Sequence, residues 1–296
     1  MPPRVLGSSL PEERVAPGAQ DAPARVAQAG VVAPAQDDPA AADPRTEADC
    51  QPRLVWWREL GMLVALYALY SLVRNMAPDQ VAEAQHNARV IMDAERMIGL
   101  DVERQINLWA AGLPGLIIPA NYYYATLHMT VTAGVLLWLY RRRPFHYARA
   151  RSVLLVMTLF ALVGYWVYPL APPRLMTGGG YIDTVREFGL WGFTPSDELV
   201  SLSNQYAAMP SMHVGWSLWV GVAVAWLARR QWVRLLGVVY PLATLAVVVV
   251  TANHFLLDAV AALVLFILAP AVVDACVRVK AARSTAPVPA WPRARR

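Results

Sequence analysis

A histidine and an aspartate near the end of the chain stand at a spacing that suits nucleophilic catalysis. His254 and Asp258 lie four residues apart, so on a helix their side chains share one face. An aspartate that accepts the N–H of an imidazole fixes its tautomer and leaves the other ring nitrogen free to attack. A purely structural His–Asp hydrogen bond between helices is the alternative interpretation.

A second histidine ends the segment Met-Pro-Ser-Met-His at His213. Proline is favoured at the first position of a helix, so we expect a helix to begin at Pro210. The free N–H groups after it would bind an anion, and the Ser211 hydroxyl would add a donor. His213 would then protonate a leaving oxygen. An ordinary helix start with a solvated histidine is the alternative.

An arginine that follows two prolines completes the set. Pro172 and Pro173 stiffen an extended turn before Arg174, which suits a guanidinium that presents a bidentate fork to phosphate. An arginine at the level of the lipid headgroups is the alternative. Together, these residues supply a nucleophile, its orienting partner, a general acid and a charge clamp for phosphoryl transfer. The set requires no metal and no other cofactor, and the glycines at 178–180 lack the Lys-Ser/Thr of a P-loop.

The elements that must position these residues are long apolar blocks. Of the 296 residues, 57% are hydrophobic and 16% are charged, whereas about a quarter of the residues of a soluble domain are charged. Six blocks approach the roughly 20 apolar residues that cross a membrane. They are Trp56–Met76, Leu116–Tyr140, Ser152–Tyr168, Pro210–Ala228, Trp232–Thr251 and His254–Val277. We therefore predict an all-α, polytopic membrane protein with a bundle of six transmembrane helices.

The stretch Pro78–Ala111 has a different pattern, in which an apolar stripe runs beside charged residues. The stripe consists of Val90, Ile91, Ala94, Met97 and Ile98, and the charged residues are Asp93, Glu95 and Arg96. This pattern predicts an extra amphipathic helix that lies on the membrane or caps the bundle. A simple connecting helix is the alternative.

Arginines mark one end of the predicted bundle. They cluster at 141–151, at 229–234 and after residue 277, and the positive-inside rule places these segments in the cytoplasm. Both termini are then cytoplasmic, and all the candidate site residues gather at the exoplasmic boundary. Because the arginines fit a topology signal, the formal charge of +5 does not predict a nucleic-acid partner.

The ends of the chain differ from the apolar blocks. Residues 1–52 are rich in Ala, Pro, Asp and Arg and lack apolar periodicity, so we expect a disordered tail. A membrane-embedded catalytic domain would occupy 53–280, and a basic tail would follow at 281–296.

At the histidine motifs the chain resembles the type 2 phosphatidic acid phosphatase superfamily, and more closely the branch that includes inositol phosphorylceramide synthases. Residues 210–213 match the second family motif, His254 and Asp258 match the third, and Arg174 occupies the place of the first. The resemblance implies a six-helix core of the phosphatase and haloperoxidase type. It also implies that His254 forms a phosphohistidine, that Asp258 orients it, and that His213 protonates the departing oxygen.

Three positions depart from the phosphatase pattern. Val167 stands where that pattern has a lysine, Val248 where it has an arginine, and Met212 where it has a glycine. Two phosphate-binding charges are therefore missing. A diester headgroup carries less charge than a monoester and needs fewer cations, so the departures favour a lipid phosphotransferase or phosphodiesterase. Arg186, in the predicted outer loop, is a candidate replacement for a missing cation.

We therefore predict an enzyme that transfers or removes a phospho-headgroup of a membrane lipid, with a polyprenyl or phosphatidate phosphatase as an alternative. A transporter is a second class, because an intramembrane His–Asp pair can relay protons, but the sequence shows no internal repeat. A non-catalytic lipid-binding scaffold is a third class. Further candidate substrate contacts near the outer face are Asn121, Tyr123, Tyr124, His128, Asn204, Gln205, Tyr206 and Asn253.

Overall fold

A computed structural model of the protein describes residues 55–76, 80–189 and 206–284. Within these ranges the regular elements are helices, which confirms the all-α prediction. The predicted tail at 1–52 lies outside the described residues, as do Asn204, Gln205 and most of the segment 281–296. The domain boundaries at 52 and 280 therefore stay predictions.

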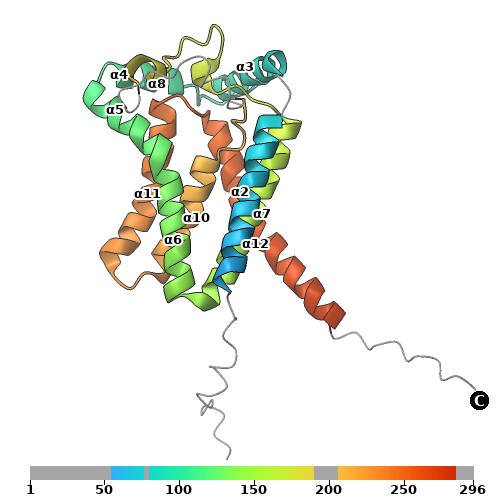
Figure 1. Cartoon of the computed structure of the whole chain (residues 1–296). Helices are drawn as coiled ribbons and strands as arrows, with labels where there is room; N and C mark the ends of the chain where they lie inside the picture. Colours follow the sequence, from blue (N-terminus) through green and yellow to red (C-terminus); the bar gives the residue numbers. More distant parts are fainter. Residues whose placement is uncertain (1–54, 77–79, 190–205, 285–296) are drawn as a thin grey trace, which may run out of the picture. The chain divides into compact units, whose positions relative to one another are not determined.

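Long helices form a bundle, and short helices cover one of its ends (Figure 1). The long helices are α2 (Trp56–Met76), α6 (His128–Arg142), α7 (Pro144–Val167), α10 (Met212–Leu227), α11 (Gln231–Val250) and α12 (Leu256–Ser284). The covering helices are α3 (Val81–Met97), α4 (Glu103–Ala111), α5 (Pro114–Tyr122) and α8 (Thr184–Phe188). The connections from α6 to α7 and from α10 to α11, which carry arginines, lie at the opposite end (Figure 1).

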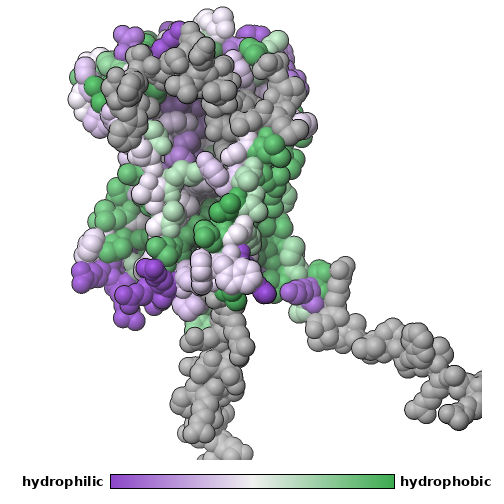
Figure 2. Space-filling model, viewed as in Figure 1, coloured by the Kyte–Doolittle hydropathy of each residue, from purple (hydrophilic) through white to green (hydrophobic). Residues whose placement is uncertain are grey.

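Three helices are long and apolar enough to cross a membrane. They are α7, α11 and the Leu256–Ala282 part of α12, while α10 is a shorter apolar helix. Outward-facing side chains on them are apolar, as for Leu242 and Ile267, which are each 62% exposed. Figure 2 shows this apolar surface between hydrophilic residues at the two ends of the bundle. The surface is consistent with a membrane location, and the count of six spans stays a prediction.

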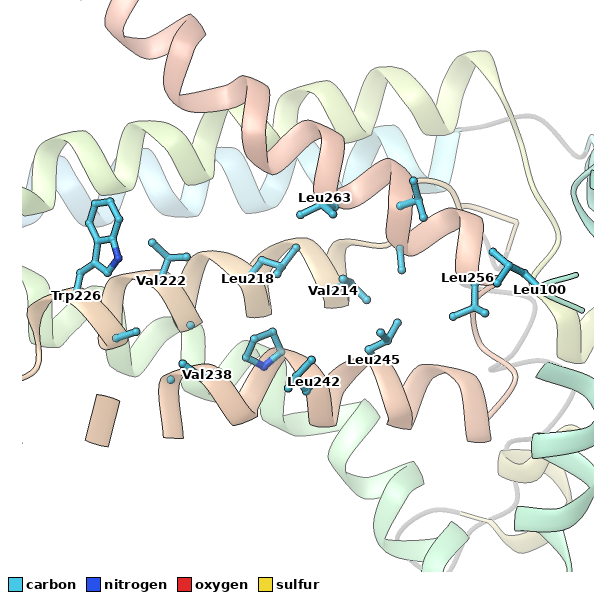
Figure 3. A pocket seen from close by; sticks show the side chains of 16 residues that line it. Leu100, Val214, Leu218, Val222, Trp226, Val238, Leu242, Leu245, Leu256 and Leu263 are labelled. Carbon is cyan, nitrogen blue, oxygen red and sulfur yellow. The ribbon is translucent and has the colours of Figure 1, made fainter. Parts of the chain in front are cut away.

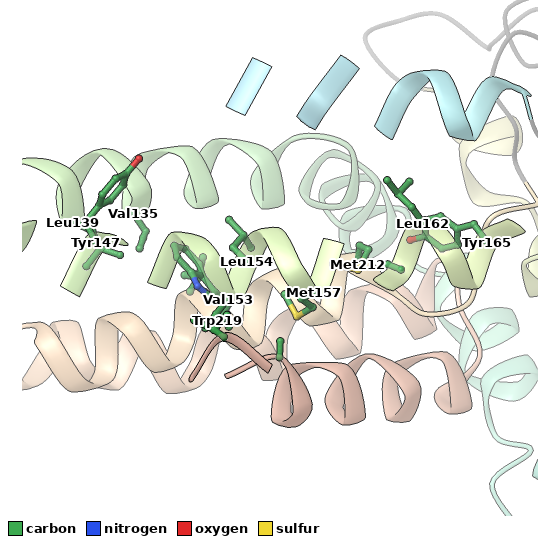
Figure 4. Packing of buried hydrophobic residues seen from close by; sticks show 14 residues of the cluster. Val135, Leu139, Tyr147, Val153, Leu154, Met157, Leu162, Tyr165, Met212 and Trp219 are labelled. Carbon is green, nitrogen blue, oxygen red and sulfur yellow. The ribbon is translucent and has the colours of Figure 1, made fainter. Parts of the chain in front are cut away.

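The bundle is held together by a buried apolar cluster and by close helix contacts. Met157 of α7, Trp219 of α10 and Ala269 of α12 belong to one cluster, much of which is drawn in Figure 4. At the crossing of α10 and α11, a Cβ on Gly221 would lie 2.6 Å from the carbonyl oxygen of Gly237. Small residues let helix backbones approach closely in membranes. This packing fixes α10 and α12, whose first turns lie beside the two histidine motifs.

The second predicted span, Leu116–Tyr140, consists of two helices joined by a π-helical segment. Helix α5 runs into the segment Tyr123–Leu127, which runs into α6. A π turn adds one residue to the helical repeat and changes which side chains face inward. Tyr124 and His128 consequently face α10, while the hydroxyl of Tyr123 hydrogen-bonds α11.

The described part of the stretch Pro78–Ala111 forms two helices, α3 and α4, and the sequence pattern sets Glu95 among the charged residues beside the apolar stripe. In the structure Glu95 is 1% exposed, whereas Met97 and Ile98 of the apolar stripe are 82% and 61% exposed. The orientation follows from hydrogen bonding, because Glu95 accepts a backbone N–H at the start of α12. Helix α3 therefore covers the bundle with a face of small and polar residues.

Candidate active site

His254 lies in the turn between α11 and α12, two residues before α12 begins at Leu256. We expected His254 to open the helix, yet the predicted pair still forms, with His254 Nδ1 3.3 Å from Oδ2 of Asp258. The imidazole is 5% exposed, and its Nε2 has no hydrogen-bond partner among the described residues. When Nδ1 carries the proton toward the carboxylate, Nε2 holds the lone pair that can react.

Asp258 is fully buried and hydrogen-bonds the start of α12 as well as His254. Its Oδ2 also accepts the N–H of Phe255 at 3.0 Å, three residues earlier, as the acid of a capping box does. Its backbone carbonyl accepts the N–H of Ser211 at 3.1 Å. Asp258 therefore joins the two histidine motifs.

Helix α10 begins at Met212, two residues later than the sequence predicts from Pro210, because Ser211 is its N-cap. The buried Ser211 Oγ accepts the N–H of Val214 at 3.4 Å. The Tyr165 hydroxyl donates to the carbonyl of Pro210 at 3.0 Å and ties this turn to α7. The role of Ser211 as a phosphate donor stays a prediction.

Four rings meet where these motifs approach each other. His213 stacks on Tyr124 with ring centroids 4.0 Å apart, and the His128 ring lies 3.9 Å from that of His213. The rings of His213 and His254 are 5.7 Å apart. This separation brings the predicted general acid and the predicted nucleophile within reach of one phosphoryl group.

Arg174, in the 3₁₀ turn Pro173–Leu175, is held at three points. Its main-chain N–H donates to the carbonyl of Ala252 at 2.9 Å, and its Nε donates to Oδ1 of Asn253 at 2.8 Å. Its Nη1 pairs with Oδ2 of Asp183 at 2.8 Å. Two of these partners, Ala252 and Asn253, directly precede the predicted nucleophile His254 in sequence, so the arginine is fixed beside it. Its contact with phosphate stays a prediction.

The other candidate contacts separate into two groups. Among them, Tyr124 and His128 stand against the histidines, and Nδ1 of His128 is buried without a hydrogen-bond partner among the described residues. Asn253 orients Arg174 instead of being open to solvent, since it is 3% exposed. The Tyr123 hydroxyl hydrogen-bonds Thr244 of α11, Asn121 bonds Thr184, and Arg186 lies exposed on α8.

Three carboxylates of the site are not predicted by the sequence pattern. Glu95 accepts the N–H of Leu257 at 2.8 Å, and Glu103 accepts the N–H of Leu256 at 2.9 Å. Asp183 pairs with the predicted clamp, and its position just before α8 is the N-cap signal that would have identified it. Glu95 and Glu103 carry no such signal, since they act on residues more than 150 positions away.

Burial changes the ionisation of this end of the molecule. Burial raises the pKa of Glu95 to about 9; the Leu257 N–H opposes the shift, and the side chains of Glu103 and Asp258 add to it. Burial likewise raises the pKa of Tyr181, with Glu103 contributing. Burial therefore favours the protonated form of Glu95.

The comparison with protein families decides the classification. A family model of the PAP2 superfamily matches residues 89–272, which is more than half of the chain and includes both histidine motifs. The chain belongs to the PAP2 superfamily. PAP2 proteins are generally phosphatases and phosphotransferases, which supports an enzyme of this type. Comparison with curated proteins and with solved structures gives no match. The finer resemblance to inositol phosphorylceramide synthases stays a prediction.

Proposed function

We propose that this PAP2 superfamily member is an integral-membrane lipid phosphotransferase or phosphoesterase that works through a phosphohistidine at His254. The observation that carries the proposal is the geometry of this ring. Its Nδ1 lies 3.3 Å from the buried carboxylate of Asp258, and Nε2 has no partner among the described residues. A carboxylate at Nδ1 stabilises the positive charge that the ring gains when Nε2 bonds phosphorus.

The reaction has two displacements at phosphorus. In the first, Nε2 of His254 bonds to phosphorus while the P–O ester bond breaks, and the leaving oxygen keeps the electron pair and takes a proton from protonated His213. In the second, the oxygen of water or of an acceptor alcohol bonds to phosphorus, its proton passes to His213, and the N–P bond breaks. Arg174 stabilises the charge on the phosphoryl oxygens. Hydrolysis and transfer differ only in the second nucleophile.

The charges around the site favour a phosphodiester substrate. Val248 stands where the phosphatase pattern has an arginine, and it is 1% exposed inside an apolar cluster. Arg174 is already shared with Asp183. A phosphomonoester carries roughly −1.5 to −2 charges at pH 7, whereas a diester carries a single negative charge. This difference supports transfer or cleavage of a headgroup over the alternative, a phosphatidate or polyprenyl phosphatase.

An apolar pocket beside the site supports a lipid substrate (Figure 3). Its volume is about 670 Å³, and its lining comes largely from α10, α11 and α12. Val214 and Leu256, which follow the two catalytic histidines in the sequence, line it, and so does Trp226 near the other end of α10. A hydrocarbon chain in this pocket would leave its phosphate close to the histidines.

We further propose six spans with both termini in the cytoplasm and the histidines on the exoplasmic side. The arginine-rich connections at the end opposite the short covering helices support this orientation. Cys276 lies exposed in the last long helix, beyond its midpoint. In a Cys50→Ser background, a membrane-impermeant thiol reagent should label Cys276 only after the cells are permeabilised. Labelling in intact cells would contradict the orientation.

The activity is tested on the purified protein in detergent. The panel holds phosphatidic acid, a polyprenyl diphosphate and phosphatidylinositol, with and without ceramide or diacylglycerol, and mass spectrometry identifies the products. We expect turnover by the wild type and by His86→Ala, an exposed histidine on α3, and no turnover by His254→Ala. The wild type should also yield an acid-labile, alkali-stable phosphoprotein. Equal turnover by His254→Ala would overturn the mechanism, and no turnover by any form would favour a transporter or a scaffold.

A further inference from the structure

Two buried glutamates are not used by the proposed chemistry. Glu95 of α3 and Glu103 of α4 both reach the first turn of α12, where they accept the N–H groups of Leu257 and Leu256 at 2.8 and 2.9 Å. Their exposed fractions are 1% and 0%. Burying carboxylates is costly unless their charges are neutralised and their oxygens are bonded. Two of them at one helix terminus therefore point to a specific role.

The two glutamates and Asp258 together occupy the N-terminus of α12. The N–H groups of Phe255, Leu256 and Leu257 go in turn to Asp258, Glu103 and Glu95. A helix N-terminus normally leaves such groups unpaired and carries a partial positive charge that attracts anions. Here the protein's own acids take that place. Substrate phosphate must therefore be held by other groups, and the first turn of α12 is fixed from two covering helices.

The side chains of Glu95 and Glu103 interact at this helix terminus, and each raises the cost of a negative charge on the other. Two ionised carboxylates have no donor between them, so a hydrogen bond between the pair requires a proton on one of them. Oε2 of Glu103 is buried and has no donor among the described N–H and O–H groups, so a protonated Glu95 supplies the donor that it lacks. Among the charged and titratable groups around the pair, Asp258 adds negative charge, Tyr181 is a phenol, and Arg96 is already paired with Asp101 at 3.0 Å.

We propose that Glu95 and Glu103 are positioning residues that share one proton, clamp the first turn of α12, and thereby hold Asp258 against His254. The inference rests on the proposed role of His254 as the nucleophile. Asp258 lies within the clamped turn and His254 directly precedes it, so a rotation of the turn changes the 3.3 Å contact between them. Loss of the shared proton puts two negative charges in contact and releases the clamp.

The test compares variants of Glu95 with a matched control on the same helix. Glu95→Ala removes the clamp, and we expect kcat to fall about 10- to 100-fold with little change in KM, since a misplaced reacting group lowers rate more than binding. Glu95→Gln keeps an acceptor for the helix and a donor for Glu103, so it should recover most of that loss. Glu83→Gln changes an exposed glutamate of α3 and should match the wild type.

The pH dependence of kcat distinguishes a positioning role from a purely structural one, because a purely structural role would leave it unchanged. Burial raises the pKa of Glu95 to about 9, whereas glutamine does not titrate. We therefore compare kcat of Glu95→Gln with kcat of the wild type, because the effect of any group that titrates in both proteins drops out of the ratio. The ratio should rise as the pH passes about 9, where the wild type loses the shared proton and the variant does not. A constant ratio would overturn the inference even if Glu95→Ala does not fold.

If His254→Ala abolishes turnover while the Glu95 variants behave as wild type, only this inference fails. If His254→Ala retains turnover, the proposed function fails first.

Discussion

Replacing Asp258 with asparagine tests whether its carboxylate does more than hold His254 in place. The amide oxygen can still accept the N–H of Phe255 and the Nδ1–H of the imidazole, which lie 3.0 and 3.3 Å from the present oxygen. What the substitution removes is the negative charge beside a ring that, in the proposed mechanism, becomes positive when it bonds phosphorus. At 3.3 Å and an effective dielectric constant of about 20, that interaction is about 5 kcal/mol.

The expected effect is smaller than this Coulomb energy. The amide dipole recovers part of the interaction, and a hydrogen bond to a charged group contributes about 1.5–3 kcal/mol. We therefore expect the barrier to rise by about 2–3.5 kcal/mol, which lowers kcat by about 30- to 400-fold. Asp258→Ala should lose more, because it also leaves the N–H of Phe255 without its acceptor.

The assay is the turnover of whichever lipid phosphoester the wild type converts, with thermal unfolding in detergent as the measure of folding. Asp274→Asn is the matched control, because it removes an aspartate from the same helix in an exposed ion pair with Arg149. Exposed ion pairs contribute about 0–1 kcal/mol, so this control should retain its rate. A kcat for Asp258→Asn within about threefold of the wild type, well short of the barrier change expected above, would refute the charge argument.

Three further predictions follow from individual contacts. Arg174→Lys replaces a fork held at Nε and Nη1 with a single ammonium, so kcat on a diester substrate should fall about 10- to 100-fold, and an unchanged rate would exclude the arginine as the clamp. Gly164→Ala places a Cβ 2.9 Å from the Pro210 ring, so Tm and turnover should both fall, whereas Gly134→Ala meets nothing within 4 Å and should preserve both. The pKa of Glu95 rises from 4.5 to about 9 on folding, so its contribution to stability is complete below pH 4.5 and is lost as the pH rises to about 9. Thermal unfolding should accordingly show a steeper loss of Tm over this range in the wild type than in Glu95→Gln, and parallel curves would contradict the raised pKa.

Hydropathy predicts the central parts of the long helices better than their ends. The fifth predicted block, Trp232–Thr251, differs from α11 by one residue at each end. The third block was predicted to begin at Ser152, whereas α7 begins at Pro144. Arg149 and Arg151 interrupt the apolar run, but they are not helix breakers. They pair with acids on α12 and α2, which a single-segment pattern does not contain.

The site was predictable where a local spacing carries the geometry. The four-residue interval predicts the contact of His254 with Asp258, and this contact is present in the structure although His254 lies outside the helix. The orientation of α3 was not predictable in this way. An apolar stripe indicates the packed face only when the opposite face meets water, and a helix at a membrane surface can turn its apolar face to lipid. The pattern therefore sets Glu95 on the charged side of the helix, whereas the structure buries it against α12.

The carboxylates around the site bear on the choice of substrate. Asp258 and Glu103 bring negative charge to the first turn of α12, while Arg174 is already shared with Asp183. A dianionic monoester would approach this arrangement with little compensating charge, since the buried Val248 offers none. A diester brings one negative charge, which Arg174 and a protonated His213 can balance. The same acids that position His254 therefore favour a diester, and this charge distribution supports the proposed exchange of a lipid headgroup.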